Sequence, residues 1–76
     1  MKSINISLNS IEKVKGFVTA IATCEGDFDL TSDRYMVDAK SIMGIFSLDL
    51  TKTLKLDIHC DEVAAKVLPE LEKFIV

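Results

Sequence analysis

The stretch Lys40-Ser41-Ile42-Met43-Gly44-Ile45-Phe46-Ser47-Leu48 decides the fold, because it places a short helix between two regions of strand-like sequence. Ser41 stands where that helix would begin, since a serine hydroxyl suits the N-cap position. Three large apolar side chains follow within four positions, which is more than so short a segment easily buries. We therefore predict a helix N-terminus beside an exposed apolar patch, an arrangement typical of a docking surface.

The sequence before this stretch has the alternation of a hairpin. Phe28 and Leu30 alternate with polar residues, and Tyr35 and Val37 do so beyond the turn residues 32–34. A period of two on both sides of a turn predicts two short antiparallel strands.

Alternating apolar and polar residues also mark a first and a fourth strand. The inward-facing positions are Ile4, Ile6, Leu8, Leu54, Leu56 and Ile58. Their polar neighbours, with His59 at the end of the fourth strand, should lie on a wet face of the sheet.

Apolar residues at helical spacing follow the first strand and predict an amphipathic helix. It should start at Asn9-Ser10, with Glu12 three residues after Asn9 as in a capping box, and Gly26 should close it as the C′ residue. Its apolar stripe is Ile11, Val14, Phe17, Val18 and Ile21.

A second long amphipathic helix should close the chain, with Asp61 as its N-cap and a bend near Pro69. The element order over residues 1–76 is then β-α-β-β-α-β-α. This order predicts one α+β domain, a two-layer open-faced sandwich whose four-stranded antiparallel sheet is covered on one face by helices.

Composition limits the classes of function. The net charge of −3, without any basic cluster, argues against nucleic-acid binding, and the apolar runs are too short to span a membrane. The N-terminus lacks the apolar core of a signal peptide, so we expect a cytoplasmic protein. Cys24 and Cys60 are expected to be reduced thiols.

No metal, cofactor or catalytic site is expected. His59, Cys60 and Asp61 are consecutive, and adjacent strand residues point to opposite faces, so these three do not converge on a metal ion. The serine, cysteine, histidine and aspartate residues show no spacing that would assemble a nucleophilic triad. We therefore expect a protein that is not an enzyme.

The segment 40–44 is similar to the regulatory-serine motif of the HPr phosphocarriers of the bacterial sugar phosphotransferase system (PTS). The resemblance covers nearly the whole chain, and residues 17–44 lie on the family pattern without a gap. It implies that Ser41 is the residue phosphorylated by a dedicated serine kinase. An equally good interpretation is that Ser41 serves only as the N-cap of the helix. The resemblance also implies that Ile42, Met43 and Phe46 form the surface that meets PTS components, the kinase and a transcriptional regulator.

The transfer chemistry of that family is missing from this chain. Counting back from Ser41, the family's phosphorylated histidine falls at Ser10, its arginine at Glu12 and its proline at Lys13. Glu12 would repel a phosphate by about 1–4 kcal/mol at surface dielectric. No histidine occurs before His59.

We therefore expect a regulatory or protein-binding HPr-like protein with a serine switch at Ser41 that does not carry phosphohistidine. Two alternatives stay open. One is an active phosphocarrier with a displaced acceptor such as Ser10, and the other is a degenerate homologue with an unrelated partner.

Overall fold

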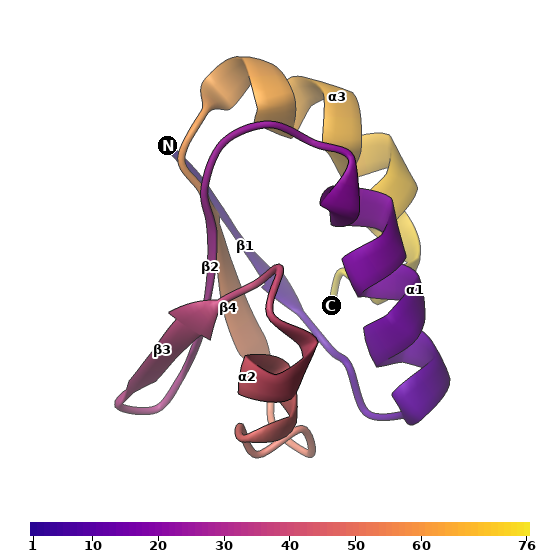
Figure 1. The fold of residues 1–76 in the computed structure, drawn as a ribbon, viewed down its shortest axis with the longest axis vertical. Helices are drawn as coiled ribbons and strands as arrows, with labels where there is room; N and C mark the ends of the chain where they lie inside the picture. The colour runs from indigo at the N-terminus through magenta and orange to yellow at the C-terminus, as the bar shows by residue number, and fades with distance from the viewer.

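The computed structural model describes residues 1–76 and confirms the predicted order of elements (Figure 1). The elements are β1 (Lys2–Ile6), α1 (Ile11–Ala22), β2 (Phe28–Ser32), β3 (Tyr35–Asp38), α2 (Ile42–Phe46), β4 (Leu54–Ile58), α3 (Asp61–Leu71) and a 3-10 helix, η1 (Glu72–Phe74). None of the helices has the length and apolar character needed to cross a lipid bilayer.

The four strands form one antiparallel sheet in the order β1-β4-β2-β3. Apolar residues face each other across it, because Ile4 pairs with Leu56, Leu56 with Leu30, and Leu30 with Val37. Side chains alternate between the two sides of each strand, so this register gives the sheet one apolar face and one polar face. The helices lie on the apolar face, which confirms the predicted α+β sandwich (Figure 1).

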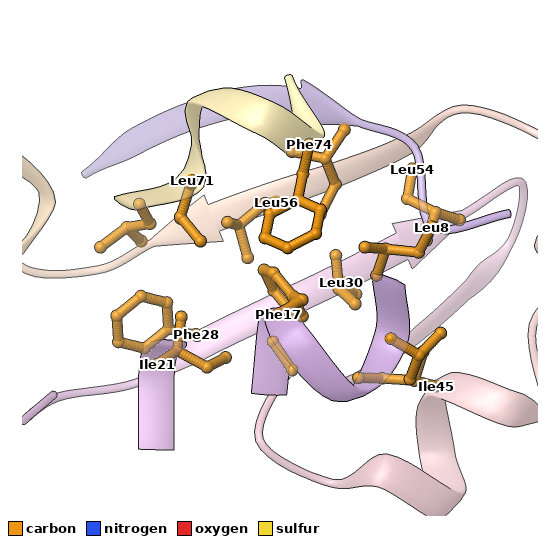
Figure 2. Close-up of a cluster of buried hydrophobic side chains, with 14 of the residues drawn as sticks. Leu8, Phe17, Ile21, Phe28, Leu30, Ile45, Leu54, Leu56, Leu71 and Phe74 are labelled. Carbon is orange, nitrogen blue, oxygen red and sulfur yellow. The ribbon is translucent and has the colours of Figure 1, made fainter. Parts of the chain in front are cut away.

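A single apolar cluster fills the space between the sheet and the helices (Figure 2). The rings of Phe17 on α1 and Phe74 on η1 meet edge to face, with 6.0 Å between their centroids and 90° between their planes. This geometry suits the quadrupoles of two aromatic rings, and it fastens the end of the chain to the first helix. The cluster also receives Ile45 from α2, so the short helix is anchored in the same core.

The predicted start of α1 at Asn9-Ser10 is confirmed, whereas its capping box and its C-terminal end differ from the prediction. Ser10 alone is the N-cap, and its Oγ accepts a hydrogen bond from the Lys13 N–H at 3.2 Å, so Glu12 takes no part in a capping box. The helix ends at Ala22 with Thr23 as its C-cap. Gly26 therefore lies beyond the helix, in the turn before β2, where its φ of +91° suits a residue without a Cβ.

The start of α3 also differs from the prediction, because Cys60 and not Asp61 is the N-cap. Asp61 is the first helical residue, and its carboxylate pairs with the N-terminal amine at 2.8 Å. Near the other end, Pro69 lies inside the helix, which continues to Leu71 and then tightens into η1. A 3-10 turn is a common way to end an α-helix.

Candidate functional site

Ser41 lies between β3 and α2 and caps the short helix. Its Oγ accepts a hydrogen bond from the Gly44 N–H at 3.3 Å, and its carbonyl accepts one from the Ile45 N–H at 3.0 Å. Its own N–H donates to the Asp38 carbonyl at 3.0 Å, which fixes the serine to the end of β3. The side chain is exposed, so the hydroxyl can be reached from solvent.

The five residues of α2 divide into one buried and several exposed apolar positions. Ile45 is fully buried and Leu48, just past the helix, is nearly so. Met43 is 77% exposed and Phe46 41% exposed, while Ile42 is half-buried. The short helix therefore uses one side to anchor itself and presents apolar side chains to solvent on the other. We call Ile42, Met43 and Phe46 the α2 patch.

A close backbone approach sets α2 against β3. A Cβ added to Gly44 would lie 3.3 Å from the Val37 Cβ and 3.4 Å from the Ser41 Oγ. The glycine thus lets the helix rest directly on the strand. At its other end, the Ser47 Oγ donates to the Gly44 carbonyl at 2.5 Å. The α2 patch is therefore held in place by the packing of Gly44 on β3 and by the hydrogen bond from Ser47.

The start of α1 contributes another exposed apolar residue. Ile11 belongs to the predicted apolar stripe of α1, but it is 62% exposed. Helical spacing indicates which way a side chain points, but it does not tell where the helix runs past the layer that would cover it. The α1 N-terminus and α2 lie toward the same end of the molecule, and the two helices are in contact (Figure 1). Ser10 and Glu12, at this end of α1, are both exposed.

The histidine and the two cysteines are not part of the α2 patch. His59 lies on the polar face of the sheet, where its Nε2 is 2.6 Å from the Asp29 Oδ2. Cys24 and Cys60 are free thiols. No group of three or more His, Cys, Asp or Glu residues is arranged to hold a metal ion. The sequence-predicted residues Ser41, Ile42, Met43 and Phe46 therefore come together on α2 and its cap, whereas His59 does not join them.

The connection that follows α2 contains two polar contacts of its charged residues. The Thr51 hydroxyl donates to the Asp49 carboxylate at 2.6 Å, and this bond, helped by the Thr51 N–H, lowers the pKa of Asp49. Next along the chain, the Lys52 amine bonds Asp33 in the β2–β3 turn at 2.8 Å, which raises the pKa of Lys52. These contacts tie the segment after the α2 patch to the hairpin.

Comparison with known proteins gives two matches. The sequence matches the family described as PTS-HPr, the PTS HPr component phosphorylation site, over residues 13–76. A crystal structure described as HPr-C-His from Thermoanaerobacter tengcongensis is similar, with a TM-score of 0.76 and 29% identity, covering 96% of this chain and 92% of that chain. No curated protein matches the sequence. The family match begins three residues after Ser10, so the opening of α1 lies outside it.

Proposed function

The chain belongs to the HPr family of the phosphotransferase system, and from this premise we propose that it is a protein-binding, regulatory member that does not carry phosphohistidine. The opening of α1 carries the proposal. The residue that we align with the family's histidine is Ser10, whose Oγ is already engaged as the helix cap. The residue that we align with its arginine is Glu12, an exposed carboxylate. On this alignment neither the phosphoryl acceptor nor its cationic partner is present.

A serine hydroxyl is a poor substitute for the imidazole in phosphoryl transfer. A serine phosphoester is more stable than a phosphohistidine, so a phosphoryl group placed on Ser10 would not pass readily to a next carrier. Glu12 would add like-charge repulsion to an incoming phosphoryl group. His59 lies on the polar face of the sheet beside Asp29, and not at a helix N-terminus that could stabilise the anion.

The α2 patch is the proposed partner surface. Met43 and Phe46 are exposed and apolar, and their helix is anchored by Ile45 in the core. A flexible methionine and an aromatic ring are side chains that protein interfaces favour. Within the PTS, the partner is a protein that meets HPr-like surfaces, such as a PTS component or a transcriptional regulator.

Ser41 is the proposed switch of this surface. A phosphoryl group on its exposed Oγ would place about two negative charges directly before Ile42 and Met43. Partners that bind the apolar side chains would then have to desolvate a phosphate, while partners that offer arginine would gain an ion pair. The switch would act by changing which protein binds, without any need for a change of fold.

Phosphoryl transfer tests the first part of the proposal. The chain is incubated with phosphoenolpyruvate and PTS enzyme I, and its intact mass is measured before and after mild acid. We expect no acid-labile phosphoryl group on the wild type. A gain of this kind that His59→Gln abolishes would overturn the proposal, and an acid-stable gain lost in Ser10→Ala would favour a displaced acceptor.

A gain-of-function variant provides the positive control for that test. Ser10→His combined with Glu12→Arg supplies the missing imidazole and guanidinium at the start of α1. We expect this double variant to accept an acid-labile phosphoryl group from enzyme I. Acceptance would also establish that the opening of α1 still fits the enzyme.

The switch is tested with ATP and the serine kinase of the system. We expect one phosphoryl group on the wild type and none on Ser41→Ala, with Ser47→Ala as the matched control that is still modified. Binding to candidate PTS proteins should weaken in Met43→Ala and Phe46→Ala, but not in Val76→Ala, which truncates another exposed apolar side chain. Modification of Ser41→Ala to the wild-type extent would remove Ser41 from the proposal.

A further inference from the structure

The two edges of the sheet are treated differently by the fold. The outer edge of β1 is partly covered by the C-terminal segment, because the Ser7 N–H donates to the Phe74 carbonyl at 2.8 Å and the Val76 N–H to the Asn5 carbonyl at 3.1 Å. The other edge, β3, has no strand, helix or terminus pairing with its outer side, where only the Asp38 carbonyl is engaged, by the Ser41 N–H at 3.0 Å (Figure 1). An edge strand of this kind is a template for another strand.

The backbone of β3 presents unpaired groups on that outer side. The Ala39 N–H donates to the Phe28 carbonyl at 2.8 Å, and in the same register Val37 lies opposite Leu30. Hydrogen-bonded pairs alternate along an antiparallel ladder, so residues two apart on β3 face β2. The N–H and C=O of Met36, between Val37 and Tyr35, therefore point away from the sheet.

The side chains along this edge are those of an interface. Tyr35 is 71% exposed and Met36 65% exposed. Arg34 is the only arginine of the chain, and it forms no ion pair within the fold. Tyrosine, methionine and arginine are enriched in protein interfaces. The edge lacks the lysine or proline with which many proteins block strand pairing.

The charged residues that flank Met36 indicate which strand could pair with this edge. Arg34 is the last residue of the β2–β3 turn and Asp38 the last residue of β3, and they stand two residues before and two residues after Met36. Asp38 also forms no ion pair, although its Oδ1 accepts the Lys40 N–H at 2.9 Å. If a second β3 runs antiparallel with Met36 opposite Met36, each Arg34 falls opposite the Asp38 of the other copy. The strand, together with the turn residue Arg34 that precedes it, is thus complementary to itself in one register.

We propose that two copies of this chain pair through β3, about a two-fold axis at Met36, and so join their sheets into one. Met36 of each copy exchanges backbone hydrogen bonds with Met36 of the other, and Tyr35 of each copy lies opposite Val37 of the other. The ion pairs between Arg34 and Asp38 occur twice because the contact is symmetric. They set the register, while the exposed tyrosine and methionine supply the apolar contact.

Sedimentation equilibrium of the full chain over a concentration series tests the proposal. We expect the wild type to dimerise reversibly. Arg34→Glu and Asp38→Lys should each weaken the dimer by about tenfold or more, because two attractive pairs become repulsive. Lys66→Glu, which reverses a charge on α3, is the matched control and should leave the dissociation constant unchanged. Far-ultraviolet circular dichroism verifies that each variant is folded.

Mixing the two single variants gives the decisive result. In the mixed dimer, the acid introduced by Arg34→Glu lies opposite the lysine introduced by Asp38→Lys, and the unchanged arginine of one copy lies opposite the unchanged aspartate of the other. We expect the two variants to form a heterodimer at concentrations where neither dimerises alone. Met36→Pro removes the outward N–H, is tolerated at a strand edge, and should abolish the dimer. A wild type that stays monomeric at all concentrations, or a mixture that fails to associate, overturns the proposal.

Discussion

Gly44 of α2 and Val37 of β3 lie so close that a Cβ added to the glycine would be 3.3 Å from the Val37 Cβ. Such a contact is tighter than side chains normally make. The position of α2 against β3 therefore depends on residue 44 having no side chain. Gly16 of α1 is different, because an added Cβ there would meet only the Phe74 Cζ at 3.5 Å. The two helical glycines therefore differ in what they allow.

We predict opposite outcomes for alanine at these two glycines. Gly16→Ala should raise the free energy of unfolding by about 0.5–1 kcal/mol, because alanine is the better helix former and the space is free. Gly44→Ala should not raise the free energy of unfolding in this way, because the added methyl group crowds Val37. When Val37→Ala is also present, Gly44→Ala should be less destabilising than it is alone. Urea unfolding measures each of these variants together with Val37→Ala alone. A gain for Gly44→Ala equal to that of Gly16→Ala would contradict the packing argument.

Truncations on α2 should separate the anchor from the exposed patch. Ile45→Ala should lower the free energy of unfolding by about 2–5 kcal/mol, since it removes a fully buried side chain and leaves a cavity. Met43→Ala should change it by no more than about 0.5 kcal/mol, because that side chain is largely exposed. Thermal unfolding distinguishes the two. A large loss of stability in Met43→Ala would mean that the methionine serves the core and not a partner.

The sheet and the order of elements could be predicted from sequence because the apolar residues alternate without ambiguity. Leu54, Leu56 and Ile58 fit a period of two, and all three are fully buried. The start of α3 was predicted one residue too late, with Asp61 as the N-cap. Cys60 is the N-cap of α3 because its φ of −109° and ψ of 118° are extended, while its side chain makes no capping bond. A cap set by backbone angles alone leaves no signal in the residue type.

Part of the candidate site could also be predicted from the sequence. The serine hydroxyl of Ser41 does cap α2, and Met43 and Phe46 are exposed, but their role in binding stays a prediction. The exposure of Ile11 was missed because spacing does not reveal where a helix extends past the sheet. The bare outer edge of β3 was also missed, since strand order depends on contacts between residues far apart in the chain.

Pro69 should cost stability at its place in α3. It has no N–H to donate to the carbonyl one turn earlier, and it lies inside the helix and exposed to solvent. We predict that Pro69→Ala raises the free energy of unfolding by about 1–3 kcal/mol, as measured by urea unfolding. Glu70→Ala, at the next exposed position, should change it by less than about 0.5 kcal/mol and serves as the control. A destabilised Pro69→Ala would show that the proline shapes the approach to η1.

The turn after α2 should be sensitive to acid through Asp49. Hydrogen bonds from Thr51 lower the pKa of Asp49 in the folded chain. The stabilisation from this charge is therefore complete above the ordinary carboxyl pKa, and it is lost as the pH falls through the lowered folded value. Thr51→Val removes the hydroxyl, the largest cause of the shift, and should move the pKa of Asp49 upward toward its ordinary value.

Carbon-detected NMR titration of the Asp49 carboxyl measures this shift directly. Thr53→Val is the matched control, because the Thr53 hydroxyl makes no side-chain hydrogen bond to Asp49, and it should leave the pKa of Asp49 unchanged. The direct titration is needed because Asp49 is exposed and solvent screens its charge, so its effect on global unfolding will be small. An unchanged pKa of Asp49 in Thr51→Val would show that the hydroxyl bond does not order this turn in solution.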